Sequence, residues 1–244
     1  AAPAGQHALR LELYNVAPAQ LLNVITRIRR MFDLDADPQA IAHTLGASPS
    51  LAPLVERYPG LRLPGGWDGF EVAVRAVLGQ QVSVAAARTL ASRIVQRFGT
   101  PVEMPGIPGL NRLFPAAQQL ADAHLDQLGI TQARINTIRG IARALIDGQV
   151  DFAVEQPLET FIRRWVQLPG IGEWTAHYIA MRVLKHPDAF PAADLILRRE
   201  ANPDGAPLST KTLLELAESW RPWRAYSVMY LWRAATDAAA ARRV

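Results

Sequence analysis

The chain has 244 residues, enough for one large domain or two smaller ones with a sizeable hydrophobic core. It contains no cysteine, which excludes disulfides, thiolate nucleophiles and cysteine-held zinc or iron–sulfur centres. The net charge of +4 and the sequence pI of about 9.8 are compatible with an anionic partner, and no run of residues is long and apolar enough to span a bilayer.

The first predicted element is a β-strand over residues 9–14, where apolar and polar side chains alternate. Nearly all later segments have helical periodicity, with Asp37 as the expected cap of one helix and Pro38 in its first turn. Glycines and prolines mark a domain boundary at residues 63–66 and predict an irregular connection at residues 101–115. The predicted helices cover residues 19–32, 38–44, a segment after 50, 68–80, 83–98, 115–124, 131–147, 158–167, 172–184, 195–200, 209–221 and 223–242.

The most informative motif is the segment LPGIGEWTA at residues 168–176, which joins two predicted helices. Gly170 and Gly172 flank one apolar residue, so the backbone can bend tightly and come close to another molecule. A helix that begins just after this bend presents unpaired N–H groups, and phosphate is their natural partner. The motif therefore predicts a hairpin that grips a nucleic-acid backbone without reading its sequence, with a generic turn as the alternative.

Asp194, in the segment FPAADL at residues 190–195, is the candidate catalytic acid. A carboxylate beside a nucleic-acid grip can stabilise positive charge on a substrate and orient or deprotonate a water molecule. The same residue is also a typical N-cap for the helix that is predicted to follow. The two roles are compatible, and the residue pattern leaves both open.

These motifs carry a resemblance to a known family. The segment VLGQQVS at residues 77–83, the hairpin motif with Tyr178, the segment that contains Asp194, and WRPWR at residues 220–224 with Trp232 stand in the order found in helix-hairpin-helix DNA glycosylases. Within that superfamily the chain resembles the 3-methyladenine DNA glycosylase II family (AlkA type). The resemblance covers nearly the whole chain.

The resemblance implies a mainly α fold of two helical subdomains with a cleft between them, plus a remnant strand of an N-terminal β domain. Residues 1–18 would be that remnant, which indicates a fragment lacking most of the β domain. Residues 67–185 would form the helical domain that carries the hairpin. Residues 19–66 would pack with the C-terminal helices of residues 186–244.

The resemblance also implies how the site works. At the position of Trp174, bifunctional relatives carry a lysine, which attacks the sugar and forms a Schiff base with it. Tryptophan has no amine and cannot form this intermediate. A monofunctional enzyme with water as the nucleophile is therefore expected. Trp174 and Tyr178 share a helix face, and with Trp232 they would form an electron-rich pocket for the positively charged ring of an alkylated purine. The alternative for Trp174 is an ordinary core aromatic residue.

Further residues are expected to contact DNA by resemblance. Ile171 and Thr175, together with the two hairpin glycines, would lie against the backbone. Gln80 and Gln81 stand at a predicted turn between helices and would fill the gap that an everted base leaves, unless they simply solvate a helix end. The backbone carbonyls of Leu168 and Ile171 would hold a structural monovalent cation.

The sequence departs from the family pattern at two positions. Gln81 stands where AlkA-type proteins carry a leucine wedge, which leaves damage recognition open. Ala193 stands where close relatives carry a second acidic residue, which indicates that only one carboxylate is essential.

The expected function is that of a monofunctional base excision repair glycosylase that hydrolyses the N-glycosidic bond of alkylated purines in damaged double-stranded DNA. A glycosylase for another damaged base and a non-catalytic helix-hairpin-helix module of a larger repair protein are the alternatives. A pure binding module has no use for Asp194, because a carboxylate repels anionic DNA. We expect a cytoplasmic, nucleoid-associated monomer that requires no cofactor and has no membrane partner.

Overall fold

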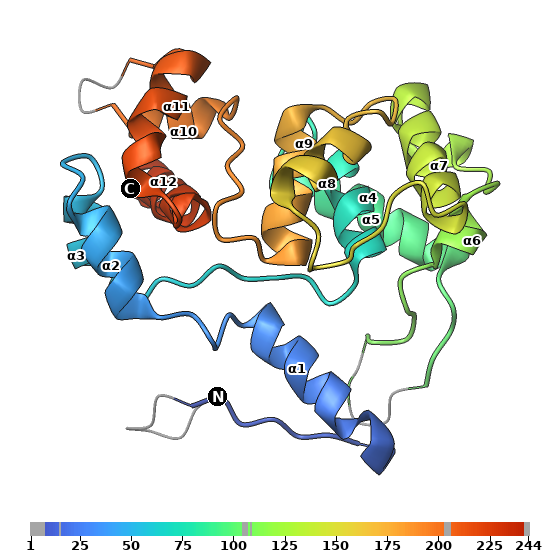
Figure 1. The fold of residues 1–244 in the computed structure, drawn as a ribbon. Helices are drawn as coiled ribbons and strands as arrows, with labels where there is room; N and C mark the ends of the chain where they lie inside the picture. The colour runs from blue at the N-terminus through green and yellow to red at the C-terminus, as the bar shows by residue number, and fades with distance from the viewer. Residues whose placement is uncertain (1–7, 15, 104–106, 108, 203–205, 242–244) are drawn as a thin grey trace.

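The computed structural model describes residues 8–14, 16–103, 107, 109–202 and 206–241. Helices dominate these residues (Figure 1), and the one β pairing among them is an isolated antiparallel bridge between Pro101 and Arg112. The prediction of a mainly α fold is confirmed. The α-helices are α1 (Leu21–Met31), α2 (Pro38–Gly46), α3 (Ala52–Arg57), α4 (Gly69–Leu78), α5 (Val84–Phe98), α6 (Ala117–Leu120), α7 (Gln132–Ile146), α8 (Leu158–Trp165), α9 (Glu173–Ile179), α10 (Leu195–Glu200), α11 (Thr210–Ala217) and α12 (Arg224–Ala241).

Several helices begin where the sequence predicts, because capping side chains bond to their first turns. Asp37 Oδ1 accepts hydrogen bonds from the N–H groups of Gln39 and Ala40 at the start of α2, at 2.9 and 3.2 Å. Asp68 and Ser83 cap α4 and α5 in the same way. Each cap stabilises its helix by about 0.5–2 kcal/mol relative to alanine.

The structure departs from the predicted elements in several places. The helix predicted over residues 172–184 is α-helical only to Ile179 and continues as a π-helix over Ala180–Leu184. The strand expected over residues 9–14 does not form: residues 8–13 have no regular structure, and no described segment pairs with them. A strand is stable only beside a partner. The helix predicted over residues 115–124 shortens to α6, because the chain turns so that Leu120 and Leu125 are both buried. Parts of the predicted N-terminal remnant, irregular connection and last helix lie outside the described residues, namely 1–7, 15, 104–106, 108 and 242.

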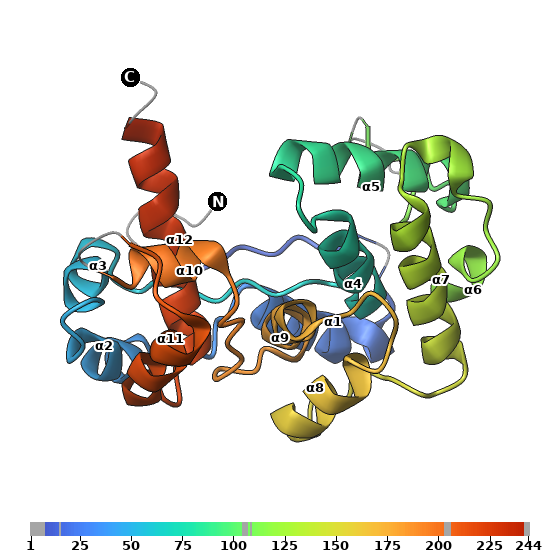
Figure 2. The same cartoon turned by 90° about the horizontal axis from the view of Figure 1, so that it is seen from above.

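The helices gather into two groups (Figures 1 and 2). A cavity is lined by residues of both groups. In one group α4 contacts α5, α7 and α9, while α6 packs against α7 and α8 against α9. In the other group α12 contacts α3 and α10, and α2 contacts α3 and the turn that follows α11. α2 and α3 therefore share one group with the last helices of the chain, and the middle of the chain forms the other.

A buried ionic cluster ties these two groups together. Asp33, which follows α1, is 8% exposed and accepts hydrogen bonds from the Tyr226 hydroxyl and the Leu63 N–H group, both at 2.9 Å. The Lys185 ammonium group, at the end of the π-helix Ala180–Leu184 that continues α9, lies 3.0 Å from the other carboxylate oxygen. Burial lowers the pKa of this lysine. Loss of one partner would leave an uncompensated buried charge, so the cluster fixes α12 and the two loops in place.

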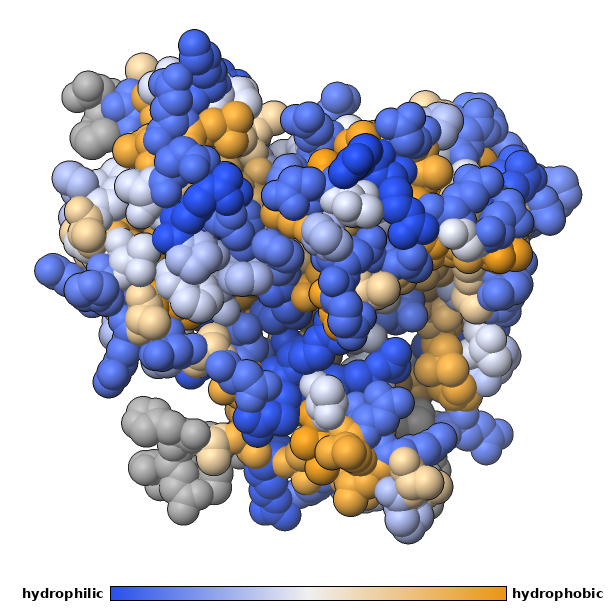
Figure 3. All heavy atoms as spheres, in the orientation of Figure 1, coloured by the Kyte–Doolittle hydropathy of each residue, from blue (hydrophilic) through white to orange (hydrophobic). Residues whose placement is uncertain are grey.

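α1 lies apart from the hydrophobic core. None of its residues is buried, and Leu22 is 75% exposed. Figure 3 shows a hydrophobic patch in the lower part of the molecule, over α1. Of the helices in the described ranges, none combines the length and the hydropathy that crossing a bilayer requires.

Candidate active site

A cavity of about 850 Å³ lies between the two helix groups. Trp174 and Tyr178 reach it from α9, Trp232 from α12, and Asp194 from the start of α10. The three aromatic residues and the acid predicted for the site therefore line one cavity. The other lining residues are Arg75, Ala76, Gly79, Val82, Val84, Ala87, Arg88, Ile196, Ala235, Thr236, Ala239 and Ala240.

The three aromatic rings lie in a row along one wall, and the first two of them are stacked. The rings of Trp174 and Tyr178 are nearly parallel, with centroids 5.4 Å apart and an interplanar angle of 11°. Trp232 follows at 6.2 Å from Tyr178, tilted by 43°. The Arg182 guanidinium lies 5.7 Å from the Tyr178 ring centroid. Trp174 is half-buried and belongs to the cavity wall, which argues against the alternative of an ordinary core residue.

Asp194 acts as a helix cap and faces the cavity at the same time. Its Oδ1 accepts hydrogen bonds from the N–H groups of Ile196 and Leu197, at 2.9 and 3.1 Å. Its Oδ2 accepts a hydrogen bond from the Trp174 indole Nε1–H at 2.9 Å. The carboxylate is half-buried, and these three donors hold both of its oxygens in a fixed orientation.

The loop that delivers Asp194 is held by contacts from two helices. The Nδ1 atom of His177, on α9, accepts a hydrogen bond from the Phe190 N–H group at 3.2 Å. Asp188 accepts two hydrogen bonds from the Arg224 guanidinium of α12, both at 2.7 Å. Burial, reinforced by the nearby charge of Arg224, lowers the pKa of His177 to about 4. The imidazole is therefore neutral at pH 7, which leaves Nδ1 able to accept.

The hairpin motif forms the turn between α8 and α9. Gly170 has φ +86°, a conformation that favours glycine, and a Cβ atom there would lie 2.0 Å from Thr137 Oγ1. Gly172 is the N-cap of α9, and none of the side chains that the structure describes bonds to the first turn of that helix. A Cβ atom at Gly172 would meet nothing within 4 Å. The turn therefore needs glycine at 170 for its shape, whereas Gly172 leaves open space beside the helix start.

Gln80 and Gln81 occupy different surroundings after α4. The Gln80 amide donates hydrogen bonds to the Gly170 carbonyl oxygen at 3.2 Å and to Thr175 Oγ1 at 3.1 Å, so it braces the hairpin against α4. Thr175 is itself buried. Gln81 is exposed at the tip of the turn and has φ +55°. Gln81 is thus the more suitable of the two to enter a gap in DNA, and the DNA contacts of these residues stay predictions.

The carbonyl groups expected to hold a monovalent cation lie in the hairpin turn. The Leu168 carbonyl oxygen accepts a hydrogen bond from the Ile171 N–H group at 3.0 Å, and the Ile171 side chain is buried. Backbone carbonyl oxygens are suitable ligands for an alkali ion, so the chemistry of these two groups fits a monovalent cation. Among the described residues, no three acidic or histidine side chains stand close enough together to hold a metal ion.

Several residues of the site escape prediction from sequence. Ala235, Thr236, Ala239 and Ala240 form the cavity wall on α12. Their spacing from Trp232 along one helix face is a signal that could have found them. The positions of Arg75 and Arg88, and the bond from His177 to the loop before Asp194, depend on how distant helices pack.

Two family models match the chain. The model described as AlkA N-terminal domain matches residues 1–68. The model described as HhH-GPD superfamily base excision DNA repair protein matches residues 74–224, more than half of the chain. The chain therefore belongs to the HhH-GPD superfamily of base excision DNA repair proteins.

Within this superfamily the chain is of the 3-methyladenine DNA glycosylase II (AlkA) type. It is 33% identical over 230 residues to DNA-3-methyladenine glycosylase 2 of Escherichia coli K12, which covers 93% of this chain and 77% of the relative. It is 43% identical over 213 residues to "Probable bifunctional transcriptional activator/DNA repair enzyme AlkA" of Mycobacterium tuberculosis CDC 1551, which covers 87% of this chain. The chain spans 42% of the length of that relative.

A solved structure supports the same assignment. The 3-methyladenine DNA-glycosylase from Archaeoglobus fulgidus superposes with a TM-score of 0.76 at 25% identity, covering 89% of this chain and 75% of that one. The family assignment made from the four sequence motifs is confirmed.

Proposed function

We propose that the chain is a monofunctional DNA glycosylase that hydrolyses the N-glycosidic bond of alkylated purines, of the 3-methyladenine type, in double-stranded DNA. The observation that carries this proposal is the Asp194 carboxylate, which lies in the wall of an aromatic cavity with Oδ2 bonded to the Trp174 indole. The activity in the name of the Escherichia coli relative supports the same conclusion.

Recognition of the base would rest on stacking and charge. A base inside a duplex cannot reach this cavity, so the target nucleotide must be everted first. Trp174, Tyr178 and Trp232 line the cavity and would provide the aromatic surface against which the base stacks. Alkylation places positive charge on the purine ring, and an electron-rich aromatic wall attracts that charge. An uncharged purine lacks this attraction.

The chemical step would be a hydrolysis assisted by Asp194. The bond between C1′ and the base nitrogen breaks, and its electron pair stays with the alkylated base, which leaves as a neutral molecule. The sugar becomes oxocarbenium-like, and the fixed carboxylate stabilises that positive charge. Water then forms a bond to C1′ and gives up one proton to Asp194 or to solvent. The products are a free base and an abasic site.

The proposal of water as the nucleophile is supported by where the lysines lie. The sequence contains two, Lys185 and Lys211. Lys185 is paired with Asp33 in the buried cluster, and Lys211 is exposed on α11. Neither lines the cavity. A Schiff base needs an amine beside the sugar, so the DNA strand would stay intact until alkali or heat cleaves it.

Binding of the duplex would use the open helix start of α9. The first N–H groups of a helix attract phosphate, and no side chain caps them here. A monovalent cation on the Leu168 and Ile171 carbonyls would act structurally, and the proposed reaction uses no cofactor. We further propose that the protein acts as a monomer on nucleoid DNA in the cytoplasm.

The test is incubation of the purified chain with N-methylated duplex DNA, followed by alkali to reveal abasic sites. Alkali-dependent breaks that require methylation are expected. Nicking without alkali would contradict the monofunctional assignment. Duplex binding without any base release would favour a non-catalytic module instead. Gly172→Val should weaken duplex binding whether or not a lesion is present, and unchanged binding would contradict the proposed phosphate contact.

A further inference from the structure

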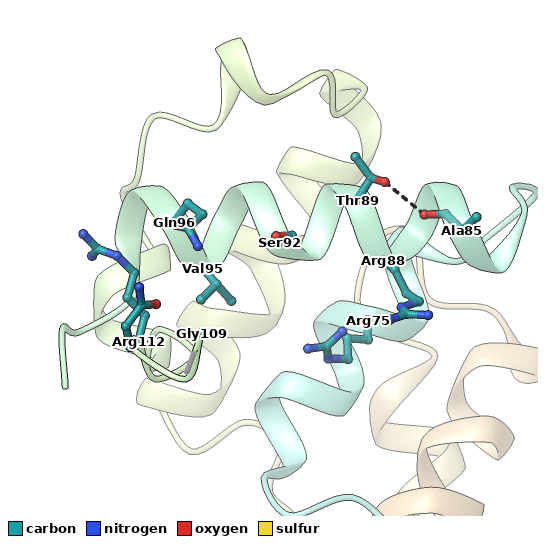
Figure 4. A pocket seen from close by; sticks show the side chains of 10 residues that line it. Arg75, Ala85, Arg88, Thr89, Ser92, Val95, Gln96, Gly109 and Arg112 are labelled. Atoms are coloured by element: carbon teal, nitrogen blue, oxygen red, sulfur yellow. Dashed lines mark hydrogen bonds between the residues drawn. The ribbon is translucent and has the colours of Figure 1, made fainter. Parts of the chain in front are cut away.

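A second groove lies beside the aromatic cavity, along one face of α5. This α5 groove has a volume of about 590 Å³ and is bounded by α5, the end of α4 and the segment at residues 109–112 (Figure 4). Three arginines line it, Arg75, Arg88 and Arg112. None of its lining residues, all within the described ranges, is Asp or Glu. The groove is therefore basic.

The three arginines differ in whether their guanidinium groups already have partners within the protein. Arg75 is paired with Glu71 at 2.7 Å, and Arg112 donates a hydrogen bond to the Gly99 carbonyl oxygen at 2.8 Å. Arg88 is exposed, and within the described part of the chain it has no hydrogen-bond or ion-pair partner. All five donors of its planar guanidinium are thus available to an anion.

Hydrogen-bonding side chains repeat along the groove side of α5. Arg88, Ser92 and Gln96 stand at every fourth position, so they form a row that advances about 6 Å per step. Figure 4 shows Arg88 beside Arg75 at one end of the groove and Arg112 with Gln96 toward the other. Such a row suits an extended ligand that repeats its acceptors, because a compact ion would use only one step.

The α5 groove adjoins the aromatic cavity. Arg75 and Arg88 line both. The cavity is largely apolar, whereas the groove is basic and polar. A nucleic-acid strand has the same division, with flat bases on one side and a chain of phosphates on the other. A strand that sends one nucleotide into the cavity must also continue beyond it.

We propose that the α5 groove binds the sugar–phosphate backbone of the DNA strand that carries the everted nucleotide, with Arg88 on the phosphate nearest the cavity. This inference rests on the proposed function. It gives the strand a second backbone contact in addition to the hairpin. The contact reads no base, so it adds affinity without narrowing the range of sequences.

The first experiment compares Arg88→Ala with Arg97→Ala in binding to a duplex that contains an abasic analogue. Arg97 is a matched control, because it is an exposed arginine on the opposite face of α5 and does not line the groove. We expect Arg88→Ala to bind roughly tenfold more weakly, with a salt dependence that corresponds to about one fewer phosphate contact. Arg97→Ala should bind like the unsubstituted chain. Equal affinities for the two variants would overturn the proposal.

The second experiment identifies the strand. Neutral methylphosphonate groups replace single phosphates along the lesion strand and then along its complement. We expect at least one position on the lesion strand where a methylphosphonate weakens DNA binding by the unsubstituted chain but does not weaken binding by Arg88→Ala. If a methylphosphonate effect that depends on Arg88 occurs only on the complementary strand, or on neither strand, the assignment of the groove to the lesion strand would be overturned. Base release by the unsubstituted chain tests the proposed function separately, so normal release without an Arg88 effect would reject the groove alone.

Discussion

α9 and α10 both bring their first turns to the aromatic cavity, but the two helix starts are capped differently. At α10 the Asp194 carboxylate accepts hydrogen bonds from the N–H groups of Ile196 and Leu197. At α9 the N-cap is Gly172, and within the described ranges no side chain bonds to the first turn. Both helix starts carry the partial positive charge of the helix dipole.

The difference shows how one fold can serve two anions. At α10 the positive helix end is occupied by an anion of the chain itself, so the carboxylate is fixed beside the cavity. At α9 the corresponding position is empty of side chains, so an external phosphate can take it. In the proposed function, the first arrangement would fix the reacting group and the second would leave a place for a DNA phosphate. Substitutions at Asp194 and Gly172 therefore separate the two roles.

The largest effect is expected for Asp194→Asn. Asparagine caps a helix as well as aspartate does, so the fold and the start of α10 should be retained. The negative charge is lost, and single-turnover base release from methylated duplex should fall by about 10²- to 10⁴-fold. Duplex binding should be retained or strengthened, because a carboxylate that repels anionic DNA is removed. Base release at the full rate would remove Asp194 from the mechanism.

Trp174→Phe should have the next largest effect. Phenylalanine keeps a ring in the stack but removes the indole N–H that bonds to Asp194 Oδ2. Because a hydrogen bond to a charged group contributes about 1.5–3 kcal/mol, we expect base release roughly 10- to 100-fold slower. Trp232→Phe is the control, since it also reduces ring area but leaves the carboxylate contacts intact. Equal losses in the two variants would mean that only stacking matters.

Gly172→Ser should convert the open helix start into a capped one. Serine is a preferred N-cap, and its side chain has room because no atom lies within 4 Å of a Cβ at this position. Its hydroxyl would compete with phosphate for the first N–H groups of α9. We expect duplex affinity about tenfold weaker with thermal stability unchanged or raised. Undiminished affinity in titrations at fixed salt would show that phosphate binds elsewhere.

The smallest effect concerns His177 and pH. Burial lowers the pKa of His177 to about 4 in the folded protein, whereas an unfolded histidine titrates near 6.5. The unfolded chain therefore binds more protons in this range, so stability is complete above about pH 6.5 and falls as pH drops toward 4. In His177→Asn the amide oxygen can still accept a hydrogen bond from the Phe190 N–H group. The loss of unfolding free energy between neutral and acidic pH should therefore be smaller in this variant by about 1–3 kcal/mol. Urea unfolding of both proteins at pH 7 and pH 4.5 measures this difference. An identical pH dependence in the variant would contradict the role given to His177.

Local parts of this structure can be predicted from the sequence. The caps Asp37, Asp68 and Asp194 act on N–H groups two or three residues away, so the sequence contains both partners. The hairpin glycines are predictable for the same reason, because the bend depends on backbone conformation.

Contacts between distant segments cannot be predicted in this way. The Trp174 indole reaches Asp194, and the Gln80 amide reaches Gly170, only because separate helices dock against each other. The two glutamines look equivalent in sequence, yet one braces the hairpin and the other is exposed. The alternation of residues 9–14 is a local signal that fails, since a strand requires a neighbour.

Two abasic analogues in the same duplex give the sharpest test of the idea that Asp194 faces the reacting sugar. One is a neutral tetrahydrofuran, and the other is a pyrrolidine whose ring nitrogen carries a positive charge where the oxocarbenium charge would develop. The unsubstituted chain should bind the pyrrolidine duplex more tightly, and Asp194→Asn should bind both equally. A preference for the charged analogue that survives this substitution would mean that another group stabilises the cation, and the account would be wrong.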